Sequence, residues 1–171
     1  LTMRDELLSL RLQEKHRRLA RLLAQRALLL EEYLERELEK GRIKLALSPM
    51  QGQTAWLHGH CHQKAFDAVS PALRLLERIP GLQTQLIQGS CCGMAGAFGY
   101  DVKTIEISKA MAEATLLPAV RAAKTDDWIV ADGTSCRHQI HDGAQRKSVH
   151  VATLLAWNLG LRAANLKKGR P

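Results

Sequence analysis

The sequence lacks the features of a membrane or secreted protein. It contains no apolar run approaching the roughly 20 residues that a membrane helix needs, and its N-terminus lacks the charged-then-apolar order of a signal peptide. Hydrophobic residues make up 46% and charged residues 25% of the 171 residues, as in ordinary globular domains. We therefore expect a soluble, cytoplasmic protein with no membrane span.

Aromatic residues are scarce, with three Trp, two Tyr and two Phe. The net charge of +8 would suit a nucleic-acid-binding protein, but no aromatic-rich basic stripe accompanies it. Many basic residues lie between positions 11 and 26, and apolar residues recur there and beyond at intervals of three and four: Leu19, Leu22, Leu23, Ala27, Leu30 and Leu34. This spacing predicts a buried stripe on an amphipathic helix whose basic face is solvated. We expect no nucleic-acid partner, while an acidic protein partner stays open.

Cysteine is also rare, with four residues in the chain. Thiols stay reduced in the cytoplasm, so metal binding or redox chemistry is a better explanation for them than a disulfide framework. The sequence has neither the GxGxxG turn of a dinucleotide-binding fold nor the closely spaced CxxCxxC run of a ferredoxin.

What the sequence does contain is an alternation of strands and helices. Three apolar segments have the length of strands: residues 54–57, 82–87 and 128–131. Helical patterns follow them at 65–79, at 105–123 with a break near Pro118, and at 139–141 and 149–162. Ahead of them, residues 3–40 form one long or broken helix and residues 43–47 a short strand or extended arm. The order predicts an α/β fold, a Rossmann-like parallel sheet with right-handed crossover helices, preceded by a long N-terminal helix.

Each predicted strand runs into a turn that carries cysteine. The turns are HGHCHQ at 58–63, SCCG at 90–93 and DGTSC at 132–136. The carboxyl ends of parallel strands lie on one side of a sheet, where ligands bind, so we expect the four thiols to meet there: Cys61, Cys91, Cys92 and Cys136. Four thiols at one point are a metal or cluster site.

The surroundings of these turns favour anionic sulfur. The glycines give the backbone freedom and N–H groups for hydrogen bonds to sulfur. Helices that begin just after the turns, with Lys64 and Arg137 nearby, would add positive charge.

The residues alone leave three kinds of site open. The first is an iron–sulfur or thiol redox site. The second is a structural zinc site formed by the cysteines with or without His58, His60 or His62, with His60 and His62 as weaker candidate ligands. The third is a nucleophilic cysteine with a histidine base, against which the four sulfurs argue, because that chemistry needs only one.

The three cysteine segments resemble the C-terminal cysteine-rich (CCG) domain of FAD-linked oxidases that carry iron–sulfur domains. That group includes D-lactate and D-2-hydroxyglutarate dehydrogenases. Its domain is similar to those of the iron–sulfur component of glycolate oxidase, the C subunit of anaerobic glycerol-3-phosphate dehydrogenase and the B subunit of heterodisulfide reductase. The resemblance implies that residues 1–165 are a CCG-type domain and residues 166–171 a flexible basic tail. Because the chain opens on Leu1 inside a helical pattern, we expect it to be the C-terminal piece of a longer polypeptide.

The resemblance also implies an oxidoreductase with an electron-transfer role. In such proteins a flavin oxidises a 2-hydroxy acid, and iron–sulfur centres pass the electrons to a quinone or another acceptor. Carried over to this chain, Cys61, Cys91, Cys92 and Cys136 match the motif cysteines proposed to hold a cluster, expected here as 4Fe–4S. FAD-binding and ferredoxin-type domains, in the same polypeptide or in a partner protein, are the implied partners. The implied location is cytoplasmic or peripheral to the inner membrane through the acceptor, and the fragment alone should be inactive.

One position departs from the family pattern. The fuller motif ends in CxxC and usually occurs twice, whereas here Gln139 stands in place of the last cysteine and one copy is present. This leaves open whether the isolated chain holds a complete site, a partial one or none. A structural zinc domain that docks subunits, without redox activity, is the alternative function.

Overall fold

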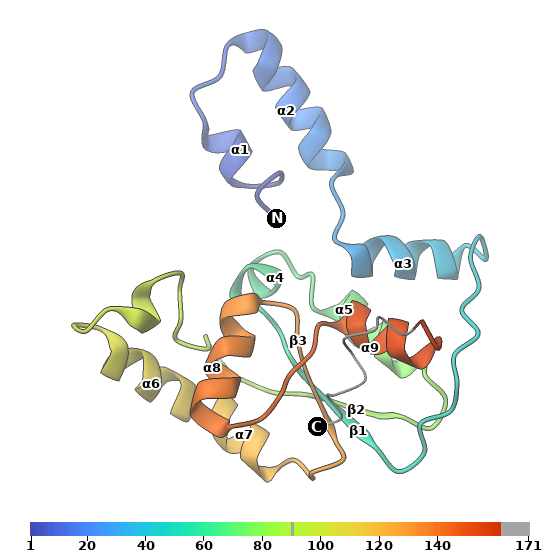
Figure 1. The fold of residues 1–171 in the computed structure, drawn as a ribbon. Helices are drawn as coiled ribbons and strands as arrows, with labels where there is room; N and C mark the ends of the chain where they lie inside the picture. The colour runs from blue at the N-terminus through green and yellow to red at the C-terminus, as the bar shows by residue number, and fades with distance from the viewer. Residues whose placement is uncertain (90, 162–171) are drawn as a thin grey trace.

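The three predicted strands form one parallel sheet (Figure 1). The computed structural model describes residues 1–89 and 91–161, so the predicted tail at 166–171 lies outside the described residues. The strands are β1 (Thr54–His58), β2 (Gln83–Leu86) and β3 (Trp128–Ala131), in the order β2-β1-β3. All pairs are parallel, which confirms the expected α/β fold.

Alternation along the strands sends side chains into two separate cores. Because successive residues of a strand point to opposite faces, Ala55 and Leu57 of β1 pack with Trp128 and Val130 of β3 in the first core. Trp56 packs on the other face of the sheet, against a second core that contains Ile129 and Ala131 of β3. The central strand β1 is therefore buried on both sides, as parallel strands usually are.

Helices cover both faces of the sheet (Figure 1). The first core is closed by α5 (Ser70–Glu77) and α9 (Val151–Asn158), and the second by α7 (Leu116–Ala122) and α8 (Thr134–Ala144). The apolar residues of α5 recur at i, i+3 and i+4, at Ala72, Leu75 and Leu76, which gives the helix one buried face. The remaining elements of this part are α4 (Cys61–Ala65), the 3₁₀ turn η1 (Phe98–Tyr100) and α6 (Ile105–Glu113).

Several helix boundaries differ from the prediction. The segment 105–123 breaks between α6 and α7, and Pro118 lies in the first turn of α7, where a missing N–H costs no intrahelical bond. The segment 65–79 is divided by a turn in which Asp67 has a φ of 51°. The piece expected at 139–141 is part of the longer helix α8, because the third cysteine turn is itself the start of that helix.

The N-terminal region is the broken form of the predicted 3–40 helix. It consists of α1 (Glu6–Ser9), α2 (Glu14–Arg26) and α3 (Leu30–Glu39). α1 and α2 form an arm that rises above the body, and α3 lies along the body (Figure 1), where it packs on α5. The Arg4 guanidinium pairs with Glu32 and donates to the Ala27 carbonyl at 2.7 Å, which fixes the joint between arm and α3. Residues 43–47, predicted as a short strand or an extended segment, are extended and pair with no described strand.

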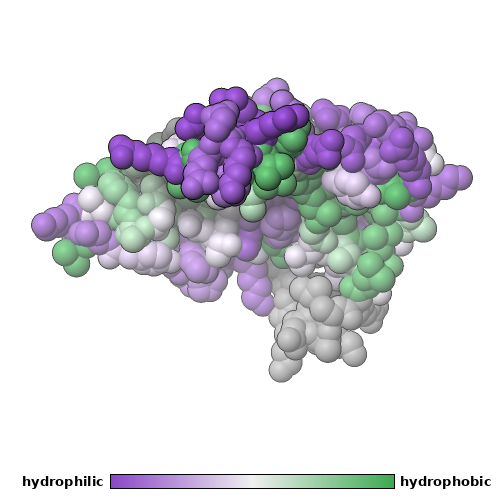
Figure 2. All heavy atoms as spheres, turned by 90° about the horizontal axis from the view of Figure 1, so that it is seen from above, coloured by the Kyte–Doolittle hydropathy of each residue, from purple (hydrophilic) through white to green (hydrophobic). Residues whose placement is uncertain are grey.

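The prediction that the leucine stripe is buried is wrong for α2. Leu19 is 61% exposed and Leu22, Leu23 and Leu30 are also exposed, and seen from above the arm shows hydrophobic residues between hydrophilic ones (Figure 2). Periodicity identifies an apolar face, but the arm projects from the body, and within the part of the chain that the structure describes these leucines stay exposed. Among the described helices, none is long and apolar enough to cross a membrane.

Asp127 joins the starts of β1 and β3. Its carboxylate accepts hydrogen bonds at 3.0 Å from the Thr54 N–H, the Trp56 indole N–H and the Lys124 N–H. Burial alone would raise the pKa of Asp127, but these three donors outweigh it and hold the pKa below its usual value. The ionised carboxylate is therefore part of what fixes the register of the sheet.

We predict that Asp127→Asn lowers the free energy of unfolding at pH 7 by about 1–3 kcal/mol, because it removes an anionic acceptor from three N–H donors. A lowered folded-state pKa stabilises the fold above the unfolded-state pKa, and this contribution is lost as the pH falls through the folded-state value. The difference between wild type and variant should therefore shrink below about pH 4. Urea unfolding at a series of pH values measures it. Asp126→Asn, at the exposed neighbouring position, is the control, and equal effects of the two substitutions would contradict the prediction.

Candidate functional site

The four cysteines meet at the carboxyl edge of the sheet. Cys61 is the first residue of α4 and Cys136 lies in the first turn of α8, while Cys91 and Cys92 lie in the loop after β2. The Cys61 thiol contacts the Cys91 thiol, and the Cys92 thiol contacts the Cys136 thiol. All four are free thiols. Three turns distant in sequence thus bring their sulfur atoms together, as the topology predicted.

The site has a buried side and an open side. Cys92 and Cys136, the inner pair, are 3% and 1% exposed and belong to the second core. Cys61 and Cys91, the outer pair, are half-buried. The sulfur site therefore reaches from the protein interior to the surface.

The proximity of the thiols separates their pKa values. The hydrogen bond from the Cys136 thiol lowers the pKa of Cys92 to about 4, and it raises the pKa of Cys136. Burial, and then the contact with Cys91, raises the pKa of Cys61 to about 11. Neighbouring thiols resist ionising together. A bound cation removes that restraint and releases the protons, so this arrangement suits a metal centre.

The Cys-Cys-Gly turn depends on a glycine with a left-handed backbone. Gly93 has a φ of 87°, and a Cβ there would lie 2.2 Å from the carbonyl oxygen of Ser108 in α6. The Gly93 N–H donates to Cys91 Sγ at 3.3 Å, and the Met94 N–H donates to Cys92. The tight turn therefore aims two adjacent thiols at one site and directs two backbone donors at sulfur.

The histidine nearest to the inner pair is His58, the last residue of β1. It is 1% exposed, and one of its ring nitrogens lies within 4.8 Å of the sulfur atoms of Cys92 and Cys136. Neither ring nitrogen has a hydrogen-bond partner among the described residues at normal distances, although the ring is close enough to help lower the pKa of Cys92. His58 shares the strand face of Trp56, which points to the second core.

His60 and His62, the two histidines predicted as weaker ligands, are not buried beside the inner pair as His58 is. His60 is the N-cap of α4: its Nδ1 accepts the His62 N–H at 3.3 Å, and burial lowers the pKa of His60. His62 is exposed, and its ring lies beside the carboxylates of Asp5 and Glu6. His58, His60 and His62 do not follow one strand face, because the strand ends at His58 and a helix begins at Cys61.

The two cations expected near sulfur also bind carbonyl groups. Arg137 donates to the carbonyls of Ala131 and Asp132, at 2.9 and 2.7 Å, and Lys64 donates to the Gly89 carbonyl at 2.6 Å. Both side chains therefore hold the ends of the strands and turns that carry the cysteines.

A hydrogen-bonded chain connects the first and third cysteine turns. Gln63 accepts the His60 N–H at 2.9 Å and donates to Asp132 at 2.8 Å, and Asp132 accepts the Val151 N–H at 2.9 Å. It ties α4, the end of β3 and the start of α9 together, so the distance between the turns is set by buried polar contacts.

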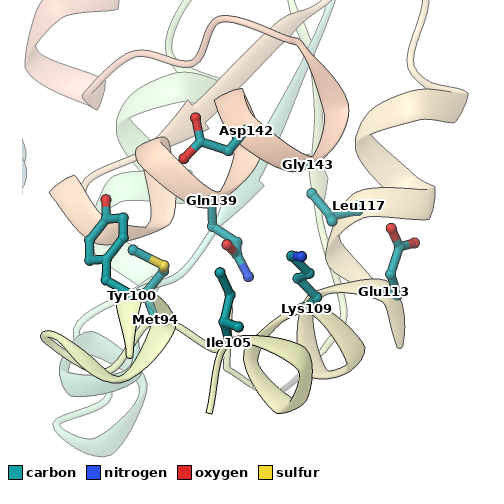
Figure 3. Close-up of a pocket in the computed structure, with 10 residues that line it drawn as sticks. Met94, Tyr100, Ile105, Lys109, Glu113, Leu117, Gln139, Asp142 and Gly143 are labelled. Atoms are coloured by element: carbon teal, nitrogen blue, oxygen red, sulfur yellow. The ribbon is translucent and has the colours of Figure 1, made fainter. Parts of the chain in front are cut away.

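Gln139, in place of the last motif cysteine, has a packing role. Its amide group donates to the Ser108 carbonyl at 3.2 Å and to the Ser108 hydroxyl at 3.3 Å, which holds α8 on α6. It extends from α8 into a pocket of about 220 Å³ between α6, α7 and α8 (Figure 3). The same Ser108 carbonyl packs on Gly93, so Gln139 supports the Cys-Cys-Gly turn through α6.

We predict that Gly93→Ala disturbs the cysteine turn more than Gly96→Ala. Both positions have positive φ, for which an alanine costs about 1–2 kcal/mol, but only at Gly93 would the new methyl group meet the Ser108 carbonyl, since nothing lies within 4 Å at Gly96. Chemical unfolding and the rate of thiol modification measure both variants. Equal stability losses in the two variants would show that the close approach to Ser108 is unimportant.

Comparison with known proteins finds relatives among dehydrogenase subunits. Over 124 residues, or 72% of this chain, the sequence is 31% identical to the C subunit of anaerobic glycerol-3-phosphate dehydrogenase from Escherichia coli strain K12, and equally to that from Escherichia coli O157:H7. The chain spans 30% of the length of these curated relatives. No family model matches the chain, and no solved structure matches it. The chain is thus a homologue of part of one component of a dehydrogenase.

Proposed function

We propose that this chain is an iron–sulfur electron-transfer domain of the CCG type and forms part of an FAD-linked 2-hydroxyacid dehydrogenase. In this proposal Cys61, Cys91, Cys92 and Cys136 hold the cluster, a 4Fe–4S centre. The observation that carries it is the approach of four free thiols from three separate turns at one sheet edge. The similarity to a component of a dehydrogenase supports an oxidoreductase role.

The residues present fit such a centre. Thiolates are the ligands of iron–sulfur clusters, and Cys92 already has a pKa of about 4 next to its three neighbouring thiols. The N–H groups of Gly93 and Met94 point at sulfur, and such donors offset the negative charge of a cysteine-bound cluster and tune its potential.

Each part of the site has a distinct task under this proposal. A bound cluster would supply one-electron chemistry. The inner pair and the second core keep water from one side of the site, which raises the influence of the backbone donors there. The outer pair lies near the surface, where a ferredoxin-type or FAD-binding domain can approach. The electron acceptor would be a quinone or another carrier, and the location cytoplasmic or peripheral to the inner membrane.

A structural zinc site is the second candidate. The specific observation in its favour is the buried group of His58, Cys92 and Cys136, whose ligand atoms lie within 4.8 Å of one another. Zinc binds such mixed sulfur and nitrogen sets tetrahedrally. The domain would then dock subunits without redox activity of its own.

Metal analysis distinguishes the two functions. We predict that the chain, purified or reconstituted without oxygen, contains about four irons and four sulfides per molecule, with a broad visible absorbance that dithionite bleaches. A folded protein that takes up zinc stoichiometrically, and no iron under reconstitution, would establish the docking function instead.

Substitution of the thiols tests the ligand set. We predict that Cys61→Ser, Cys91→Ser, Cys92→Ser and Cys136→Ser each lose most of the iron, because a hydroxyl is a poor ligand for a cluster that thiolates hold. Ser135→Ala, next to Cys136 in the same helical turn, is the matched control and should keep the wild-type iron content. Circular dichroism confirms that each variant is folded. Full iron occupancy in any folded serine variant would remove that cysteine from the ligand set.

A further inference from the structure

We propose that His58 is a nitrogen ligand of the metal centre, so that the site is a mixed cysteine–histidine site. This inference rests on the proposed function, because it requires that the cysteines bind a metal. It deepens that function by naming a ligand that the cysteine motif does not contain.

The burial of His58 without partners is the first argument. The residue is 1% exposed, and neither ring nitrogen has a hydrogen-bond partner at normal distance among the described residues. The ring interacts with the Cys92 thiol, a proposed metal ligand. A buried polar group without a partner is unfavourable, and native proteins keep few such groups. A bond from one ring nitrogen to a metal satisfies the ring, as it does for histidine ligands in general.

The position of the ring is the second argument. A ring nitrogen of His58 and the sulfur atoms of the inner pair all lie within 4.8 Å of one another. Metal–sulfur bonds of about 2.3 Å and metal–nitrogen bonds of about 2.0 Å place tetrahedral ligands roughly 3.5–3.8 Å apart. Small side-chain movements therefore suffice for the three atoms to bind the same metal centre.

The backbone also fixes His58 more firmly than a loop would. His58 ends the central strand β1 and is paired with Ala131 of β3, while Cys92 and Cys136 belong to the core on that side of the sheet. Ligands on rigid elements hold their geometry best.

The other histidines around the site are engaged elsewhere or exposed. His60 Nδ1 caps α4, His150 Nδ1 accepts the Ala152 N–H at 3.1 Å, and His138 Nδ1 lies 3.0 Å from the Tyr100 hydroxyl. His62 is exposed. Gln139, which stands where the family motif has its last cysteine, uses its amide to hold Ser108. His58 thus supplies a donor from β1, whereas Gln139 of α8 supplies none.

The test compares His58→Gln, His58→Cys and the exposed control His62→Gln, all reconstituted without oxygen. The first readout is pulsed EPR of the reduced cluster, in which a directly bound histidine gives a strong ¹⁴N coupling. We expect this coupling in wild type and His62→Gln and its loss in both His58 variants. His58→Gln should lose most of the iron, whereas His58→Cys should keep it with a lower reduction potential, because histidine ligands raise the potential relative to thiolates.

The outcomes separate this inference from the function on which it rests. A wild-type cluster without nitrogen coupling, or with coupling that survives in folded His58→Gln, overturns His58 as a ligand and leaves the iron–sulfur function standing. Weak coupling alone, with unchanged iron content, means a hydrogen bond from the ring to sulfur and also overturns it. If the chain binds zinc and no iron, cobalt substitution reports the same ligand change through its visible absorption bands. A chain that binds neither metal overturns both proposals.

Discussion

Four thiols packed side by side resist ionising together, and much of the surrounding structure holds them in place and stabilises negative charge on sulfur. Close sulfur atoms compete for protons, so the pKa of Cys92 falls while that of Cys136 rises. The parallel sheet brings the turns to one edge, and the Cys-Cys-Gly turn directs backbone N–H groups at sulfur. The polar chain through Gln63 and Asp132 keeps the turns at a set distance. Each of these features favours negative charge on sulfur in a confined space.

Supports for this arrangement extend into more distant elements. Gln139 on α8 holds Ser108 on α6, and the Ser108 carbonyl in turn limits the space at Gly93. On the other face of the sheet, the buried carboxylate of Glu35 on α3 binds Arg78 at 2.7 Å, which anchors the N-terminal region on the body. These contacts hold helices on opposite faces of the sheet.

The sheet and the convergence of the cysteines could be predicted from the sequence because both depend on local signals. Short apolar runs followed by glycine-containing turns specify where strands end, and parallel topology then brings the turns together. Helix ends were less predictable, since the DGTSC segment could be read as a turn or as the start of α8. Leu19 and its neighbours form an apolar face in sequence, but whether another element covers that face depends on how the arm leaves the body.

The role of His58 illustrates a different limit. The sequence showed histidines at alternate positions, but the alternation has meaning only within the strand, which ends at His58. The predicted strand ended at Leu57, one residue too early. A strand that includes His58 places its side chain on the same face as Trp56, whereas His60 lies beyond the strand and does not share that face. The available signal in the sequence was that His58, a polar residue, directly follows the apolar run at 54–57 and could therefore be the buried last residue of the strand.

The unequal burial of the two cysteine pairs has a chemical consequence. Dioxygen, peroxide and other oxidants dissolved in water can reach the outer pair directly, whereas the inner pair is sealed within the second core. Oxidation of a thiol depends on access as well as on thiolate character. Cys92, the sulfur most readily ionised, is thus also one of the two best shielded from attack, and the vulnerable side of the centre is the rim where Cys61 and Cys91 face the solvent.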